Sequence, residues 1–188
     1  MRSICLLSLA ALLTLQGCAP AVVATGAGVV AVSASDRRTT GIQVEDQSIA
    51  LKASNRISSG LGDQVHVNVT SFNRNVLLTG EAPTEALRAE AEKLAVGVEN
   101  VRAVTNEIAV AGISTFGARS NDTYITSKVK ARLVDSGKVS ANHVRVVTEA
   151  SVVYLMGLVT RAEAAAATEV ARTTGGVRKV VRVFEYID

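Results

Sequence analysis

The chain contains one structural unit twice, and this internal repeat limits its possible folds more than any other feature. Segments separated by 76 to 77 residues match in the same order along both halves. Residues 76–80 (VLLTG) align with 153–157 (VYLMG), and His66 aligns with His143. A repeat of this length that keeps its order predicts two copies of one supersecondary unit in tandem.

Each copy has the pattern of a helix, two strands, a second helix and a last strand. Val residues alternate along the first strand, and a short polar turn leads into a second strand that ends at Gly80 or Gly157. Thr84 begins the next helix in the first copy, and a capping box from Thr160 to Glu163 begins it in the second. The last strands are expected at about 101–110 and 178–187. An apolar residue at every fourth position marks the opening helices: Ile49, Ala53 and Ile57, and then Ile125, Val129 and Leu133.

The order αββαβ predicts an α+β fold made of two tandem modules. In each module a three-stranded mixed sheet would be covered by two helices, since the second helix is long enough for a crossover connection. Asp46 and Asp122 are expected near the starts of the opening helices. There a carboxylate accepts hydrogen bonds from free N–H groups and suits the positive end of the helix dipole.

The N-terminus has the features of an export signal. Arg2 is followed by an apolar run from Ile4 to Leu15, which is too short to span a bilayer as a helix. Gly17 and Cys18 follow, and this order resembles the lipobox of bacterial lipoproteins, in which cleavage leaves an acylated N-terminal Cys. We therefore expect a signal peptide over 1–17 and a lipid anchor on Cys18. A secreted protein with an incidental Cys is the alternative.

The segment between the anchor and the repeat is expected to be a tether, over 18–44. Residues 19–35 carry no charge and consist mainly of Gly, Ala, Val and Ser. Cys5 would be removed with the signal peptide, so the mature chain would have no disulfide and no Cys-based metal site. In bacterial lipoproteins, which this segment resembles, an Asp directly after the acylated Cys retains the protein in the inner membrane. This chain has Ala19 at that position. The resemblance therefore favours the outer membrane, with the protein facing the periplasm.

The repeated module resembles the BON domain. The resemblance rests first on the pattern of the second strand, which ends at Gly80 and at Gly157. It rests also on the residues that lead into the third strand, 98–101 (VENV) and 175–177 (GGV). Two such modules, at 45–113 and 114–188, behind a lipobox resemble the dual-BON-domain outer-membrane lipoproteins, the DolP or YraP family. The resemblance implies an association with phospholipid membranes and a role in envelope integrity.

Charge differs between the two halves. Residues 45–112 have six Lys or Arg against nine Asp or Glu, whereas 113–188 have eleven against seven. The second module is therefore expected to face an anionic partner. Its opening helix also has a Tyr where the first copy has Ser48, and Tyr suits the headgroup level of a membrane. The expected phospholipid-binding residues are Tyr124, Lys128, Lys130, Arg132 and Lys138.

Two other interpretations of this helix remain. Tyr124 would pack at the edge of the core or in the seam between the modules, or the basic residues would simply be solvated. The main functional alternative is a protein-binding adaptor in outer-membrane or cell-wall assembly, which would use sheet edges and the acidic first module.

No catalytic constellation is found in the sequence, so an enzyme is not expected. His66 and His143 are expected at strand starts, and nothing in their spacing indicates a metal site. No cofactor is indicated, and a net charge of +3 is too small to argue for nucleic-acid binding.

Overall fold

The computed structural model describes residues 36–188, and these belong to one compact unit, Ser33–Asp188. The expected signal peptide, Cys18 and residues 18–35 of the expected tether lie outside the described residues. Among the residues described, no helix is both long and apolar enough to cross a bilayer.

The first module runs from α3 to β4, and α3 begins five residues before the expected boundary at 45. The order of its helices and strands is the expected αββαβ, with a last strand divided into β3 and β4. Both of these short strands pair in parallel with β2, and β1 pairs with β2 in antiparallel fashion. The elements are α3 (Thr40–Leu61), the short helix η1 (Gly62–Gln64), β1 (His66–Phe72), β2 (Asn75–Ala82), α4 (Glu85–Val96), β3 (Ala103–Asn106) and β4 (Ala109–Val110).

The second module repeats this topology from α5 to β7. Its sheet has the order β5-β6-β7, antiparallel and then parallel, so the α+β prediction is confirmed in both copies. The capping box between Thr160 and Glu163 is also confirmed at the start of α6. The elements are α5 (Phe116–Ser136), η2 (Ala141–His143), β5 (Val144–Glu149), β6 (Val152–Val159), α6 (Arg161–Arg172) and β7 (Lys179–Tyr186).

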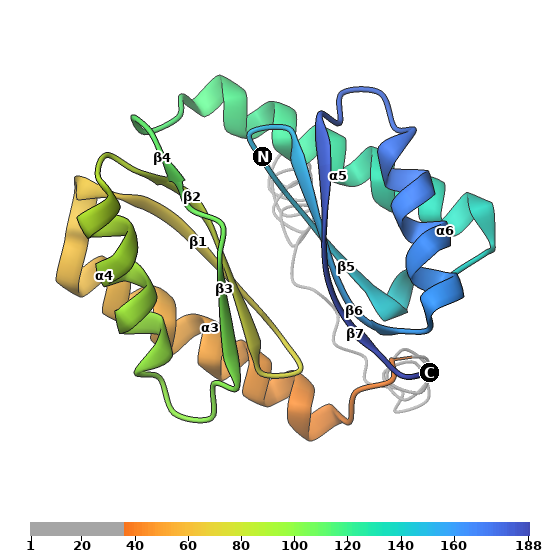
Figure 1. The fold of residues 1–188 in the computed structure, drawn as a ribbon, viewed down its shortest axis with the longest axis horizontal. Coiled ribbons are helices and arrows are strands. Elements are labelled where there is room, and N and C mark those ends of the chain that lie inside the picture. Colours follow the sequence, from red (N-terminus) through yellow and green to blue (C-terminus); the bar gives the residue numbers. More distant parts are fainter. Residues whose placement is uncertain (1–35) are drawn as a thin grey trace, which may run out of the picture. The chain divides into compact units, whose positions relative to one another are not determined.

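Two helices cover one face of each sheet, as Figure 1 shows. In the first module the inward stripe of α3 packs on α4 and on alternate residues of β1 and β2. In the second module α5 and α6 bury the equivalent positions of β5 and β6. The apolar stripe expected from the sequence is fully buried: Ile49, Ala53 and Ile57, and Ile125, Val129 and Leu133.

The other faces of the two sheets pack against each other. Phe72 and Leu77 of the first module form one buried cluster with Tyr154 and Met156 of the second, and we call this cluster the inter-sheet core. Burial in this layer raises the pKa of the Tyr154 hydroxyl to about 12. Strands β2 and β6 are therefore buried on both faces.

The structure corrects the expected role of the repeated aspartates. α3 begins at Thr40 and α5 at Phe116, so Asp46 and Asp122 lie in the second helical turn and cap neither helix. Both carboxylates are buried and point at the turn between the first two strands of their own module. Asp46 accepts hydrogen bonds from the N–H groups of Asn73 and Arg74, at 2.8 and 2.7 Å.

Asp122 holds the equivalent turn in the second module, where Ala150 and Ser151 donate their N–H groups at 2.8 Å each. The two central residues of both turns have positive φ, between 48° and 63°. Positive φ at both central residues is typical of a tight hairpin turn, and Gly or Asn normally occupies such positions. A buried carboxylate that accepts both N–H groups stabilises the turn without Gly, because hydrogen bonds to a charged acceptor are strong.

Gly80 is required because the backbones of the paired strands β1 and β2 lie very close together at this position. Its φ is +119°, and a Cβ atom built there would lie 2.0 Å from the carbonyl oxygen of His66. Gly157 has the same role in the second module, where a Cβ atom would lie 2.3 Å from the carbonyl oxygen of His143. The two glycines of the repeated strand pattern therefore allow a close approach of two backbones.

We expect Gly80→Ala to lower the free energy of unfolding by about 2–4 kcal/mol, because the strands must separate and the backbone is strained. Chemical denaturation followed by circular dichroism measures this change. Gly112→Ala is the control, since a Cβ there meets nothing within 4 Å. It should change stability by less than about 0.5 kcal/mol. Equal stability of the two variants would contradict the close-approach explanation.

Candidate functional site

Among the described side chains of helix α5, large apolar groups of Tyr124 and Val134 are exposed to solvent. Its inward residues are buried, whereas Tyr124 is 63% exposed and Val134 is 64% exposed. At the position equivalent to Tyr124, the first module has Ser48, which is half-buried. The exposed ring of Tyr124 does not close the core or the seam between the modules, so it is available for an external contact.

Two of the expected basic residues are tied to the end of α6. Lys128 Nζ donates to the carbonyl oxygen of Gly175 at 2.8 Å, and lies 5.2 Å from the centre of the Tyr124 ring. The Arg132 guanidinium spans the last turn of the same helix, where carbonyl groups lack helical partners and the dipole is negative. It donates to the Val170 carbonyl and to the hydroxyls of Thr173 and Thr174.

These contacts show that Lys128 and Arg132 hold α6 against α5. Their charge is partly used inside the protein, because each cation faces carbonyl oxygens at the negative end of α6. Lys128 still borders the Tyr124 ring, so it adds positive potential beside it.

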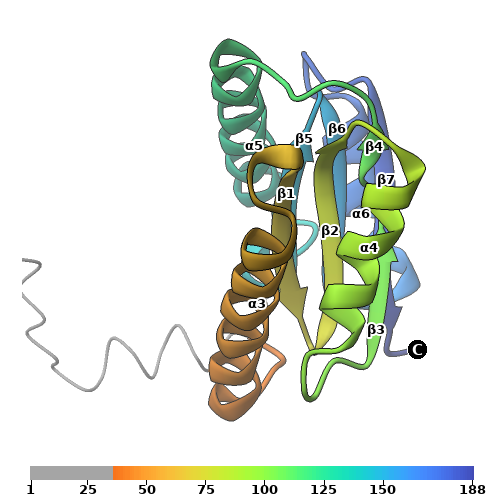
Figure 2. The same cartoon turned by 90° about the vertical axis from the view of Figure 1, so that its left-hand side faces the viewer.

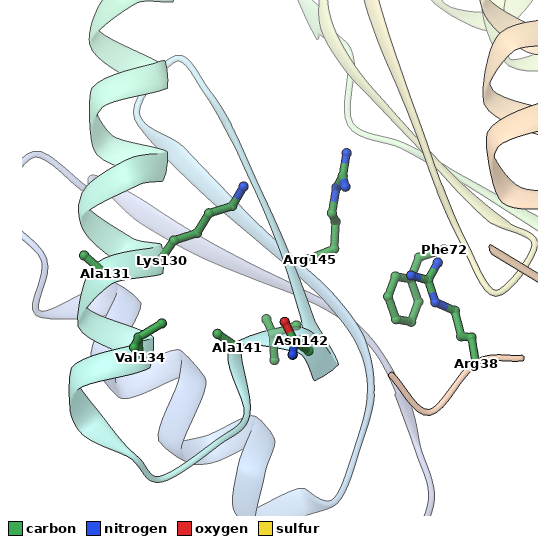
Figure 3. A pocket seen from close by; sticks show the side chains of 9 residues that line it. Arg38, Phe72, Lys130, Ala131, Val134, Ala141, Asn142 and Arg145 are labelled. Carbon is green, nitrogen blue, oxygen red and sulfur yellow. The ribbon is translucent and has the colours of Figure 1, made fainter. Parts of the chain in front are cut away.

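Lys130 lies on the opposite flank of α5 and lines a groove with Arg145 of β5. The groove has a volume of about 440 Å³ and reaches the first module. In Figure 3 the Lys130 and Arg145 side chains extend into the space between α5 and the first module. We call this hollow the basic groove, and its lining residues are Arg38, Phe72, Lys130, Ala131, Val134, Ala141, Asn142, Val144 and Arg145.

The basic groove continues along the edge strands β1 and β5. A second hollow of about 410 Å³ shares Lys130 and Arg145 and is otherwise lined mainly by Thr, Ser and Val side chains. Figure 2 shows α3 and α5 along the same side of the sheets, with β1 and β5 beside them. The groove therefore depends on the packing of the two modules.

The three cations of the basic groove differ in how their charge is balanced. Arg38 donates to Asp36 and Asp46 at 2.8 Å each, and its guanidinium carbon lies 3.8 Å from the centre of the Phe72 ring. Within the described chain, Lys130 and Arg145 form no ion pair and donate no hydrogen bond from their side chains. The uncompensated positive charge of the groove therefore comes from Lys130 and Arg145.

The structure does not gather the five expected residues into one cluster. Tyr124, Lys128 and Arg132 lie together on the flank that faces α6, and Lys130 lies in the basic groove. Lys138 is exposed beyond the end of α5 and does not line the groove.

Arg145 was not identified from the sequence. It lies between Val144 and Val146, both of which face the helices, so strand alternation places it on the opposite face of the sheet. Its equivalent in the first copy is Asn68. A comparison of the two copies at this position would have shown the additional cation.

The segment before α3 connects the two modules. Arg37 donates to both carboxylate oxygens of Glu163, at 2.7 and 2.8 Å, and also to the carbonyl oxygen of Leu158. The Arg37 guanidinium and the Thr160 groups lower the pKa of the Glu163 carboxyl to about 2. The start of the first module is thereby attached to the first turn of α6.

Comparison with known proteins gives matches over both modules. Residues 45–112 and 121–188 each match the BON domain. The chain is 39% identical over 182 residues to the outer membrane lipoprotein DolP of Haemophilus influenzae, covering 96% of this chain and 94% of that protein. It is 37% identical over 154 residues to the 21 kDa hemolysin of Actinobacillus pleuropneumoniae, covering 81% and 79%. It is 29% identical over 154 residues to the osmotically-inducible protein Y of Escherichia coli, covering 78% and 75%.

The Arg37–Glu163 pair should make stability depend on pH. The pKa of Glu163 in the folded protein, about 2, lies below its usual value of 4.5. The ionised carboxylate therefore stabilises the native state above about pH 4.5, and this contribution is lost as the pH falls towards 2. We expect Glu163→Gln to lower the free energy of unfolding by about 1 kcal/mol at pH 7, since solvent screens the pair.

Urea denaturation at several pH values measures this effect. Stability of the Glu163→Gln variant should fall less than that of the wild type between pH 5 and pH 2. Glu169→Gln, on the exposed side of the same helix, should keep the acid dependence of the wild type. Parallel curves for wild type and Glu163→Gln would contradict the assignment.

Proposed function

The chain belongs to the BON-domain family, with two modules in tandem, and from this premise we propose that it is a non-enzymatic outer-membrane lipoprotein that binds anionic phospholipid and supports envelope integrity. Its relative DolP is named as an outer membrane lipoprotein. In this proposal, acylated Cys18 anchors the chain and the described modules face the periplasm.

The observation that carries the lipid proposal is the exposed surface of α5. An aromatic ring and an aliphatic side chain, Tyr124 and Val134, are exposed on the helix that also supplies Lys130 to the basic groove. An amphipathic ring suits the interface of a bilayer, and cations suit the phosphate groups beside it. The first module lacks both the ring and the added cation at the equivalent positions.

Each part of this surface would have a separate role. Tyr124 would enter the headgroup level, with Lys128 and Arg132 beside it, and Lys138 would add positive charge beyond the end of α5. Lys130 and Arg145 would attract phosphate at the mouth of the basic groove. Direct contact need not be strong, since a lipid anchor raises the local concentration of membrane.

We expect Tyr124→Glu to weaken binding to anionic vesicles by about 1–2 kcal/mol, or roughly fivefold to thirtyfold, through loss of the ring and added repulsion. The measurement is co-sedimentation of a soluble form that lacks residues 1–18, with phosphatidylcholine vesicles that contain or lack an anionic phospholipid. Ser48→Glu adds the same charge at the equivalent position of the first module and should bind as the wild type does. Equal binding by Tyr124→Glu would exclude this helix as the contact.

The charge contribution can be separated from that of the ring. Lys130→Gln combined with Arg145→Gln should weaken binding by about 2 kcal/mol and reduce its salt dependence, at about 1 kcal/mol for each cation. Lys52→Gln combined with Arg56→Gln removes two charges from the first module and serves as the control. If the wild type itself does not bind the anionic vesicles, a protein-binding adaptor becomes the better explanation. Such an adaptor should give a specific crosslinked partner and show no affinity for pure lipid.

A further inference from the structure

Three side chains with metal-binding atoms meet at the seam between the modules, away from the surface of α5. His66 begins β1 and Glu81 lies near the end of β2, whereas Glu149 ends β5 of the second module. Their ligand atoms all lie within 4.8 Å of one another. His66 Nδ1 lies 3.1 Å from Glu81 Oε2. Both carboxylates are buried, with 5% and 7% of their surface exposed.

The negative charge of this cluster is poorly balanced within the protein. The Asn68 amide donates to Glu149 at 2.8 Å, and the N–H of Ser114 donates to Glu81 at 3.4 Å. In the described part of the chain, no Lys or Arg forms an ion pair with either carboxylate. Burial raises the pKa of the Glu149 carboxyl, and the neighbouring Glu81 adds to this effect. A bound proton or a metal cation would balance two buried carboxylates beside one imidazole, and the imidazole nitrogen is a ligand for a metal.

The repeat shows that the fold does not need these charges. The position equivalent to Glu81 is Leu158, and the position equivalent to Glu149 is Phe72. Both of these residues pack in the inter-sheet core. The same fold therefore has apolar side chains, Phe72 and Leu158, at the positions that are equivalent to the carboxylates Glu149 and Glu81.

We propose that His66, Glu81 and Glu149 bind a divalent transition-metal ion, with Zn²⁺ as the best match, and that the ion links the two modules. One imidazole nitrogen and two carboxylate oxygens are ligands that Zn²⁺ accepts, and water would complete a tetrahedral shell. Mg²⁺ and Ca²⁺ fit less well, because they prefer six or more oxygen ligands.

The geometry allows binding with small side-chain movements. Ligands about 2 Å from a shared tetrahedral ion lie about 3.3 Å apart, so the carboxylates must close by roughly 1–1.5 Å. An ion can reach the site from solvent, because His66 lines a hollow of about 270 Å³ on the first module. On the other side, Asn68 and Glu149 line the hollow of about 410 Å³.

The test uses the mature protein in a non-ionic detergent, stripped with a chelator and titrated with ZnCl₂ by calorimetry. We expect one saturable site per chain and a rise in the melting temperature with Zn²⁺. Glu149→Gln and Glu81→Gln should each weaken Zn²⁺ binding by about tenfold or more. Co²⁺ should give the visible absorption bands of a tetrahedral site in the wild type, and these bands should be lost in both variants.

Two controls separate loss of the site from loss of the fold. Glu90→Gln replaces an exposed carboxylate of the first module and should bind Zn²⁺ as the wild type does. Without metal, Glu149→Gln should melt no lower than the wild type, since a buried charge has been removed. Absence of a saturable site in the wild type, or binding unchanged in both Glu149→Gln and Glu81→Gln, would overturn the proposal. Vesicle binding is measured without Zn²⁺, so the two proposals can fail separately.

Discussion

The contact between the two sheets is the interaction on which the rest of the structure depends. A three-stranded sheet covered by helices on one face leaves the other face open, and here that face is also apolar. Leu77 and Tyr154 lie on these faces and are buried only because the modules pack together. Each large side chain buried in this way contributes about 1.5–3 kcal/mol, so a few of them match the net stability of a typical domain.

This packing also creates the sites. The basic groove takes Arg38 from the segment before α3, Phe72 from the first module, and Lys130 and Arg145 from the second, so neither module forms it alone. The carboxylate cluster likewise needs both halves of the repeat. Duplication followed by divergence at the seam explains how two similar modules can form sites that a single module lacks.

Divergence between the copies is concentrated outside the two helix-facing cores. The buried aspartates show what has been kept, since each holds both N–H groups of a positive-φ turn in its own module. The seam shows what has changed, because Glu81 and Glu149 stand where the opposite copies have Leu158 and Phe72. Changes on the outer surface of α5 and at the seam leave the helix-facing cores intact.

The sequence by itself determined the repeat, the αββαβ order, the inward stripe of the helices and the capping box at Thr160. These follow from local rules, because periodicity and capping depend on residues within a few positions of each other. Only the tertiary structure decided that Asp46 holds a turn 27 residues away, that Lys130 faces Arg145, and that Glu149 meets His66 across the seam. Those contacts depend on how the two sheets pack, and the packing arises from apolar surfaces that carry no directional signal in the sequence.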